Sequence, residues 1–267
     1  YYESGVMDSV VVAITDDKSE RLLNAVLQSK MKGAHVYDMP TLYEILTGQV
    51  PVNHLRDAWL VYSDGYTLLR SRVLRSAKRL IDIGVSVVGL IFSFPACVVT
   101  AVAIKLDSSG PIFFRQTRVG KDGAHFTLYK FRSMTDGAEA ECGPTWADED
   151  DERVTRVGRI IRKTRIDEIP QMWNVLKGEM SLVGPRPERP GFVEGLTEDL
   201  PYYGLRHAVR PGITGWAQVN YPYGASVEDA LEKLKYDLHY VHHMDLFMDL
   251  HILLRTLRVM LLQLGGR

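Results

Sequence analysis

The chain of 267 residues has little cysteine, almost no net charge and no phosphate-binding glycine motif after its first apolar run. Cys97 and Cys142 stand in very different settings, so we expect no disulfide framework. The formal net charge of −1 provides no overall field for nucleic acid. No GxGxxG follows VVVAIT (10–15), so dinucleotide binding has little support.

The start of the chain shows no secretory signal peptide. Because the chain begins at Tyr1 rather than at a methionine, we expect further residues upstream. Charged residues make up 24% and hydrophobic residues 46%, which is typical of a folded protein. The length suffices for one large domain or two small ones with a real core.

The first seventy residues alternate apolar runs with helical segments, which predicts a small α/β unit with a parallel sheet. A sheet of so few strands indicates either the end of a larger domain or a unit completed by a partner chain. We interpret these first seventy residues as an accessory or assembly module. The expected strands are 10–15, 35–39 and 58–63, and the expected helices run to Lys32, before Gly33, and from Pro40 to Gly48.

Residues 83–104, IGVSVVGLIFSFPACVVTAVAI, form a run of 22 residues without a charge. As one helix the run would extend about 33 Å, enough to cross a hydrocarbon core of about 30 Å. A buried core helix and a transmembrane helix are both alternatives. Pro95 lies near the middle and predicts a bend, and the Ser93 hydroxyl could satisfy a carbonyl that the proline leaves free.

Basic residues flank both ends of this run, and basic flanks prefer the cytoplasmic side of a membrane. A single crossing cannot place both flanks there. Each arm would be about 15–18 Å long, about half a bilayer. We therefore favour a re-entrant helix–break–helix hairpin over residues 80–105, with its break at Ser93 and Pro95. The flanking residues are Arg72, Arg75, Lys78 and Arg79 before the run, and Lys105, Arg115 and Arg118 after it.

Three other segments have a readable local pattern. Residues 111–134 predict a β-hairpin with its turn at Gly120–Gly123. The acidic stretch 136–152 is expected to be a solvated loop. Residues 246–264 predict a helix with two polar stripes and two apolar faces, which suits a helix between protein and lipid, or an internal packing helix.

The stretch RKTRIDEIPQ (162–171) sets Asp167 and Glu168, hereafter the acidic pair, among three basic side chains. Pro170 is tolerated only in the first turn of a helix and Gly178 favours its end. The pattern thus predicts a helix from about Glu168 to Lys177 with Asp167 near its N-cap. Taken alone, the acidic pair is explained by capping.

The neighbouring cations favour chemistry on an anion over capping alone. A basic cluster at helical spacing precedes the pair, and LVGPRP (182–187) fixes an arginine between two prolines, where it could bind phosphate in a forked manner. We expect a helix N-terminus with nearby arginines to lower the pKa of Asp167. The candidate basic residues are Arg156, Arg159, Arg162, Lys163, Lys130, Arg132, Arg186 and Arg210.

Together these segments resemble a known family. KFRSM (130–134), RIDEIPQMWNVLKGEMSLVGPRP (165–187) and RPGITGWAQVN (210–220), downstream of KRLIDIGVSVVGLIFSFPACVV (78–99), resemble the monotopic phosphoglycosyl transferases. These bacterial sugar transferases begin exopolysaccharide and O-antigen assembly. The resemblance covers residues 75–267.

The resemblance implies an α+β membrane-associated catalytic domain over residues 71–267, with a re-entrant hairpin and interfacial helices, at the cytoplasmic face of the bacterial inner membrane. A partial α/β, Rossmann-like domain over residues 1–70 would precede it, with transmembrane helices further upstream. The family's break lies at a Ser-Pro pair, whereas here Phe94 separates Ser93 from Pro95.

The implied reaction moves a phosphosugar from a UDP-sugar to polyprenyl (undecaprenyl) phosphate and releases UMP through a phosphosugar-aspartyl intermediate. Asp167 would be the nucleophile, and Glu168 a magnesium ligand or proton acceptor. Membrane lipids are expected partners, nucleic acid is not, and homo-oligomers could form through the N-terminal domain. The substrate-binding candidates are Arg162, Pro185, Arg186, Pro187, Lys130, Arg132 and Arg210.

Two other classes stay open. A membrane-bound assembly protein without catalysis could use the basic cluster to bind anionic headgroups, and a glycosyl transferase moving sugar alone would release UDP. No segment of the sequence indicates which sugar would be carried.

Overall fold

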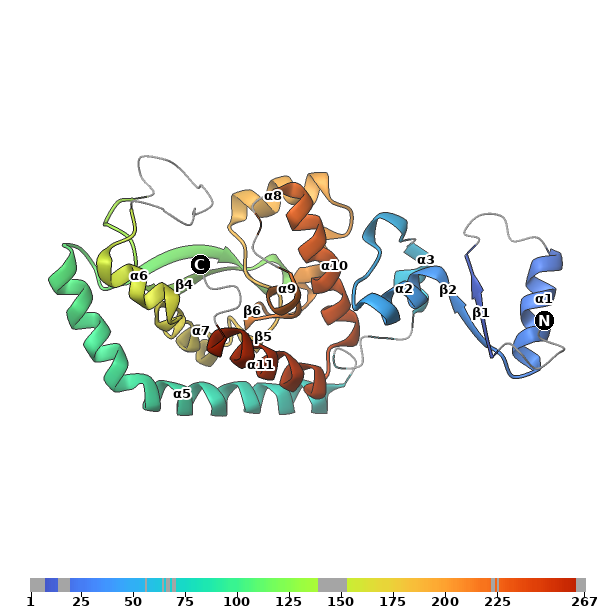
Figure 1. The fold of residues 1–267 in the computed structure, drawn as a ribbon, viewed down its shortest axis with the longest axis horizontal. Coiled ribbons are helices and arrows are strands. Elements are labelled where there is room, and N and C mark those ends of the chain that lie inside the picture. The colour runs from blue at the N-terminus through green and yellow to red at the C-terminus, as the bar shows by residue number, and fades with distance from the viewer. Residues whose placement is uncertain are drawn as a thin grey trace. The chain divides into compact units, whose positions relative to one another are not determined.

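The computed structural model describes residues 8–13, 20–55, 57–63, 65, 68, 71–138, 153–221, 224 and 226–262 (Figure 1). The chain divides into two compact units, Tyr1–Ser63 and Asp64–Arg267, whereas the sequence placed a boundary after residue 70. The larger unit contains every residue that the sequence proposed for chemistry.

The smaller unit contains a parallel strand pair, as predicted, in which Ser9 lies opposite His35. The predicted second helix is also confirmed. Asp38 accepts a hydrogen bond from the Thr41 amide at 3.0 Å, and Gly48 ends the helix with φ 65°. The elements are β1 (Ser9–Val12), α1 (Glu20–Met31), β2 (His35–Asp38), α2 (Met39–Thr47), a 3-10 turn (Val52–His54) and α3 (Asp57–Tyr62).

The prediction of a strand over residues 58–63 is wrong, because Asp57–Tyr62 forms α3. A short apolar run does not distinguish a strand from a buried helix by its pattern alone. Trp59 is buried and its Nε1 donates to Thr41 Oγ1 at 3.0 Å, whereas Tyr62 is exposed. One parallel strand pair in the described part of this unit is too little sheet to identify a Rossmann-like domain.

The apolar run lies within α5 (Arg72–Asp107), a helix of 36 residues. Its most apolar stretch has a mean hydropathy of 2.4, and only 11% of that stretch is buried. Phe92 is 81% and Val99 69% exposed. This exposure argues against a buried core helix, and the helix is long and apolar enough to cross a membrane.

The helix continues through Pro95 without interruption, and its ribbon bends along its length (Figure 1). The predicted bend is therefore found, but within one helix and not between two separate arms. Proline at this position leaves the Ile91 carbonyl without its usual donor. Ser93 Oγ donates instead to the Leu90 carbonyl at 3.4 Å, so the expected role of Ser93 toward the freed carbonyl is wrong.

The hairpin predicted after this helix is confirmed. Strands β3 (Phe113–Val119) and β4 (His125–Phe131) pair antiparallel, with Phe113 opposite Phe131. A short 3-10 turn, Lys121–Gly123, connects them at the expected place. Residues 139–152, which hold most of the predicted acidic loop, lie outside the described residues.

Further helices and two short strands make up the rest of the larger unit. Strands β5 and β6 pair in parallel, with Ser181 opposite Gly212. The remaining elements are α6 (Arg156–Lys163), the 3-10 turn η4 (Ile166–Glu168), α7 (Gln171–Lys177), β5 (Ser181–Val183), α8 (Pro190–Asp199), the 3-10 helix η5 (Tyr203–Ala208), β6 (Gly212–Thr214), α9 (Trp216–Asn220), α10 (Val227–His243) and α11 (Leu246–Leu261).

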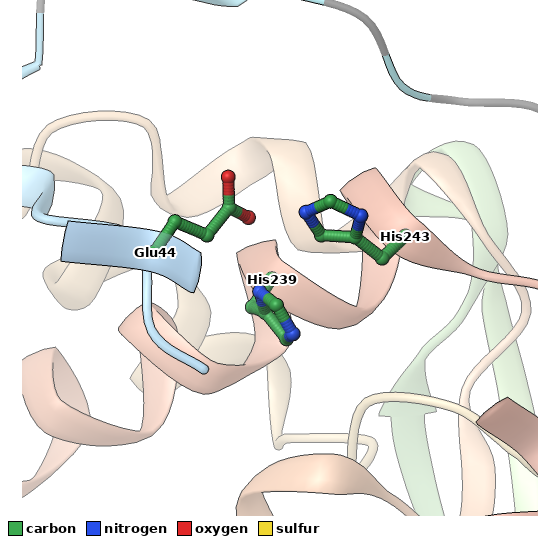
Figure 2. Close-up of side chains that lie close together, drawn as sticks. All are labelled: Glu44, His239 and His243. Atoms are coloured by element: carbon green, nitrogen blue, oxygen red, sulfur yellow. The ribbon is translucent and has the colours of Figure 1, made fainter. Parts of the chain in front are cut away.

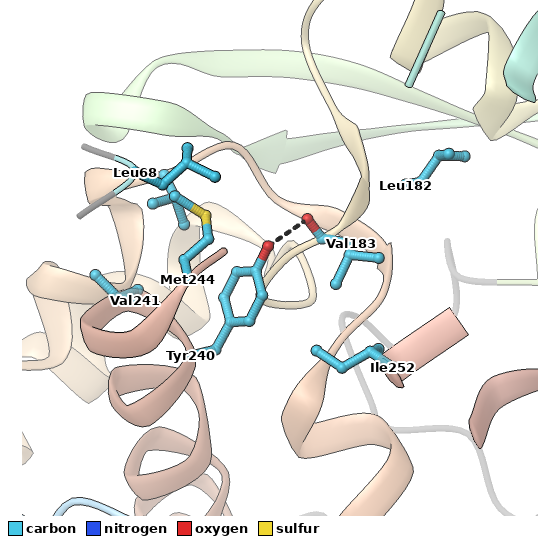
Figure 3. Close-up of a cluster of buried hydrophobic side chains, with 8 residues drawn as sticks. Leu68, Leu182, Val183, Tyr240, Val241, Met244 and Ile252 are labelled. Carbon is cyan, nitrogen blue, oxygen red and sulfur yellow. Dashed lines mark hydrogen bonds between the residues drawn. The ribbon is translucent and has the colours of Figure 1, made fainter. Parts of the chain in front are cut away.

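The principal hydrophobic core packs β5 against α10 and α11 (Figure 3). Tyr240 is almost fully buried, and its hydroxyl donates to the Val183 carbonyl at 3.0 Å. This contact fixes the end of β5, after which the chain enters the Pro185–Pro187 segment. The core residues are Leu68, Leu182, Val183, Val209, Tyr240, Val241, Met244 and Ile252.

The predicted C-terminal helix is confirmed as α11. Its polar residue Asp249 is buried, ion-paired with Lys78 at 2.5 Å, and accepts from the Tyr240 hydroxyl at 2.8 Å. Another face of the helix is apolar and exposed, with Phe247 and Leu254 on it. One polar stripe thus faces protein while an apolar stripe faces outward, the arrangement expected of a helix between protein and lipid.

Histidines near the end of α10 contribute to an aromatic cluster. Figure 2 shows His239 and His243 one turn apart on this helix, with ring centroids separated by 4.6 Å. The Trp216 ring lies 6.0 Å from that of His239 and 5.9 Å from that of His251. These contacts join α9 to both α10 and α11.

Candidate active site

The acidic pair lies in a turn between two helices, not at the start of one. Arg165 has a left-handed backbone, φ 58°, which reverses the chain after α6, and the pair follows in η4. Helix α7 then begins at Gln171 with Pro170 at its N-cap. The prediction of a helix from Glu168 capped by Asp167 is therefore wrong, and capping does not explain the pair.

Glu168 is held by two cations from distant parts of the chain. Its Oε1 lies 2.7 Å from Lys130 Nζ on β4 and 3.4 Å from a terminal nitrogen of Arg186. Burial alone would raise the pKa of Glu168, but Lys130 and Arg186 outweigh burial and hold this pKa well below its usual range. Glu168 is thus a permanently charged member of a buried network.

Asp167, unlike Glu168, has an unsatisfied carboxylate oxygen and a raised pKa. It is 8% exposed, and its Oδ1 is buried without a hydrogen-bond partner among the described residues. Burial, followed by the charge of Glu168, raises the pKa of Asp167 to about 6, against the opposing charges of Lys130, Arg165 and Arg162. The expectation of a lowered pKa is wrong, because burial outweighs the cations.

The raised pKa still leaves Asp167 chemically competent. At neutral pH a carboxyl group with a pKa near 6 is about nine-tenths ionised. Its charge is poorly compensated compared with that of Glu168, which has two ion-pair partners. An ionised, buried and underpaired carboxylate is the state expected of a nucleophile.

The Pro185–Pro187 segment presents Arg186 to Glu168 from a fixed backbone. The Gly212 amide donates to the Pro185 carbonyl at 2.9 Å, and Arg118 donates to the Pro187 carbonyl at 3.1 Å. Arg206 donates to the Arg186 carbonyl at 2.9 Å. The two prolines therefore position the arginine through backbone contacts, in agreement with the predicted rigid presentation.

Two arginines near the acidic pair in sequence also act on it. Arg162 occupies the last turn of α6, and its charge favours the ionised form of Asp167. Arg165 acts in the same direction on both carboxylates, although the sequence did not single it out. Its position two residues before Asp167 was the available signal.

Arg132 and Arg210, two of the predicted substrate-binding residues, make their hydrogen bonds away from the acidic pair. Arg132 is buried and donates to the carbonyl oxygens of Ser108 and Ser109, at 2.8 and 2.6 Å. Arg210 donates to the Gly178 carbonyl at 2.8 Å, at the C-terminal end of α7, away from η4. Arg132 also donates to the Ser108 hydroxyl at 2.9 Å, so both guanidinium groups bind parts of the chain other than the acidic pair.

A comparison with known protein families covers the region that contains this site. The family model described as "Bacterial sugar transferase" matches residues 73–263. The chain belongs to this family. The members are phosphoglycosyl transferases, as the sequence motifs predicted, and the matched region contains the acidic pair, Lys130 and the Pro185–Pro187 segment.

Individual phosphoglycosyl transferases match over much of the chain. The UDP-N-acetylgalactosamine-undecaprenyl-phosphate N-acetylgalactosaminephosphotransferase of Aeromonas hydrophila is 42% identical over 266 residues, covering 97% of this chain and 60% of that protein. The UDP-glucose:undecaprenyl-phosphate glucose-1-phosphate transferase of Escherichia coli is 43% identical over 190 residues, covering 70% and 40%. The undecaprenyl-phosphate glucose phosphotransferase of Komagataeibacter xylinus is 43% identical over 187 residues, covering 68% and 35%. The chain therefore spans 35% to 60% of the length of these relatives.

Proposed function

We propose that the chain transfers a phosphosugar from a UDP-sugar to undecaprenyl phosphate and releases UMP, as the first membrane step of exopolysaccharide or O-antigen synthesis. The names of the relatives support the sugar phosphate and the undecaprenyl-phosphate acceptor. The observation that carries the proposal is the buried acidic pair, in which Glu168 is ion-paired and Asp167 Oδ1 has no hydrogen-bond partner in the described structure.

Asp167 would act in two displacements at one phosphorus. Its carboxylate oxygen forms a bond to the phosphorus that bears the sugar, the bond from that phosphorus to the bridging oxygen breaks, and UMP leaves with the electron pair. A phosphate oxygen of the polyprenyl carrier then attacks the same phosphorus and displaces Asp167. No net proton transfer is needed when the acceptor phosphate is ionised.

The surrounding cations would neutralise the diphosphate during these steps. Arg186 is presented on a rigid segment, and Arg162 and Arg165 already act on Asp167 through their charges. Lys130 is paired with Glu168, so its role is to fix that carboxylate at the site. Charge stabilisation by positioned cations is the usual contribution of a protein to phosphoryl transfer.

Magnesium is the cofactor that we propose. Carboxylate oxygens are its preferred protein ligands, and a buried carboxylate oxygen without a hydrogen-bond partner lies beside Glu168 in the acidic pair. Glu168 would hold the ion. When bound, magnesium would neutralise charge on the diphosphate.

Helix α5 would serve as a re-entrant hairpin at the cytoplasmic face of the inner membrane. Its exposed apolar surface, its bend and the basic residues at both of its ends support entry and exit by one face. We also propose that the N-terminal unit mediates homo-oligomer formation. Cysteine labelling just outside each end of α5 tests the hairpin, because labelling from opposite faces would contradict it.

The release of UMP without lipid acceptor tests the covalent route. The wild type, incubated with a panel of UDP-sugars, should release UMP in amounts up to one per enzyme and gain the mass of a phosphosugar. Asp167→Asn should do neither, whereas Asp122→Asn, an exposed carboxylate in the β3–β4 turn, should behave like the wild type.

The same assay separates the competing classes. Release of UDP in place of UMP would identify transfer of the sugar alone. A membrane-bound assembly protein would release no nucleotide, and reversal of charge at Arg162 would then weaken membrane association. Absence of the adduct across all donors, with UMP appearing only after lipid is added, would contradict a covalent intermediate.

A further inference from the structure

A buried asparagine connects the strand that carries Lys130 to the helix that follows Glu168. Asn174 lies in α7 and is 0% exposed, although its side-chain amide is polar. Burial of an amide is unfavourable unless the amide makes its hydrogen bonds. The partners of this amide therefore show what the residue does in the fold.

The amide of Asn174 binds the backbone of β4 at two places. Its Nδ2 donates to the Thr127 carbonyl at 2.7 Å, and its Oδ1 accepts from the Tyr129 amide at 3.2 Å. Residues two apart in an antiparallel strand present their backbone groups to the same edge. In the described part of the chain, β4 pairs with β3 alone, so this second edge has no strand beside it. Asn174 takes the place of a neighbouring strand there, one position from Lys130.

Glu179 fixes the direction in which the amide of Asn174 is turned. The same Nδ2 also donates to a Glu179 carboxylate oxygen at 2.7 Å, and the other oxygen of Glu179 pairs with Lys177 at 2.5 Å. If the nitrogen and oxygen of the amide changed places, the oxygen would face the Thr127 carbonyl and the Glu179 carboxylate, and N–H would face the Tyr129 N–H. The network therefore permits one orientation of the amide.

Apolar contacts beside the amide hold α7 against β4. Hydrogen bonds that are shielded from water in this way are strong and directional. The amide of Asn174 therefore sets the register of α7 along β4, and the apolar contacts set the separation. The buried apolar side chains at this contact are Phe126, Leu128, Val175 and Met180.

The contact between Lys130 and Glu168 depends on this register. Lys130 Nζ on β4 lies 2.7 Å from Glu168 Oε1 on η4, the turn that precedes α7. The strand and the turn each bring one partner, so movement of β4 along α7 separates the two atoms. Misplacement of a group at an active site by about 1 Å can lower the rate about 100-fold.

We propose that Asn174 is a positioning residue for phosphosugar transfer. It holds β4 in register with α7, so that Lys130 keeps Glu168 in place beside Asp167. The inference rests on the proposed function. Asn174 acts through Lys130 and does not touch the substrate.

The test is a double-mutant cycle between Asn174→Ala and Lys130→Met. Single-turnover release of UMP is measured for the wild type, both single variants and the double variant, with the UDP-sugar that reacts fastest. Each protein gives a maximal rate and a half-saturating UDP-sugar concentration, and thermal melting gives the folded fraction. Leu234→Ala is the control for destabilisation, because it removes buried packing from a different helix, α10.

Asn174→Ala should lower the maximal rate about 10- to 100-fold and leave the half-saturating concentration within about twofold. In the Lys130→Met background the same change should lower the rate less than about threefold, because the lysine through which Asn174 acts is already absent. Leu234→Ala should keep the wild-type rate per folded molecule.

Glu179→Ala takes the place of Asn174→Ala in the cycle if the latter does not fold. The Glu179 side chain is 24% exposed, so its removal disturbs the core less. Loss of this carboxylate frees the amide of Asn174 to turn. The maximal rate should fall about 3- to 10-fold, with the same dependence on Lys130.

Three results would overturn the proposal. An equal fall in rate with and without Lys130 would show that Asn174 only stabilises the fold. A wild-type rate in the folded variants would show that the register of β4 does not limit transfer. A rise in the half-saturating concentration in parallel with the fall in rate would place Asn174 in donor binding. Failure of the proposed function is a different result, because the wild type itself would then release no UMP from any UDP-sugar.

Discussion

Replacing Asp167 by asparagine should make the folded protein more stable, although it removes the proposed nucleophile. Burial, followed by the charge of Glu168, raises the pKa of Asp167 from 3.8 to about 6. The folded state therefore disfavours the charged carboxylate relative to the unfolded state. A shift of about 2 pKa units corresponds to about 3 kcal/mol, which the neutral amide should recover at neutral pH.

The gain should depend on pH in a defined direction. Above pH 6 Asp167 is charged in both the folded and unfolded states, so the unfavourable contribution is fully present. As the pH falls through about 6 toward 3.8, the folded state takes up a proton before the unfolded state does, and the cost disappears. The stability difference between Asp167→Asn and the wild type should therefore shrink from about 3 kcal/mol near neutral pH to about 0.5 kcal/mol near pH 4.

Equilibrium unfolding in detergent micelles, followed by tryptophan fluorescence at several pH values, measures this difference. At neutral pH the midpoint of thermal unfolding should rise by roughly 6–12 °C for about 3 kcal/mol in a protein of this size. Asp122→Asn is the control, because that exposed residue has φ 54°, a conformation asparagine also adopts. A less stable Asp167→Asn, or a stability gain that is the same at every pH, would refute the reasoning.

The remaining predictions concern the site and its support. Lys130→Met should destabilise the fold by about 3 kcal/mol, since it leaves the buried Glu168 with Arg186 alone at 3.4 Å, and denaturant titration measures the loss. UMP release in single-turnover assays should fall to half near pH 6 as Asp167 is protonated, and an unchanged rate at lower pH would contradict its role. Gly212→Ala should lower the melting temperature strongly because its Cβ would collide with the backbone just after β5, whereas Gly191→Ala, with open space, should not.

Local pattern was sufficient for most of the elements but not for the acidic pair's conformation. The β3–β4 hairpin, α2 and α11 follow from turn residues, caps and apolar spacing, and they are confirmed. Two misreadings have local causes. The five apolar residues of 58–62 favour a strand by their pattern, but α3 forms there. The left-handed backbone of Arg165, which no residue type dictates, converts the expected helix start into a separate turn.

The partners of the site depend on contacts that local sequence does not specify. Lys130 and Glu168 are 38 positions apart, and their pairing requires β4 to lie beside η4. Lys130 and Arg132 would share one face of a strand that continued past both residues. Because β4 ends at Phe131, the side chain of Arg132 instead binds the loop after α5.

One part of α5 is bonded to both segments that frame the acidic pair. Arg79 donates to two carbonyl oxygens in the last turn of α7, at 2.6 and 2.9 Å, and η4 directly precedes that helix. Asp82 accepts from the Leu182 amide at 3.2 Å, and Lys78 donates to the Val183 carbonyl at 3.3 Å, at the end of β5 that leads to Arg186. The same few residues of the apolar helix therefore anchor both the helix that follows the turn of the proposed nucleophile and the segment that leads to Arg186. Because both are anchored there, the depth at which α5 enters lipid would set the height of the whole site above the membrane, where the phosphate of a lipid carrier would be met.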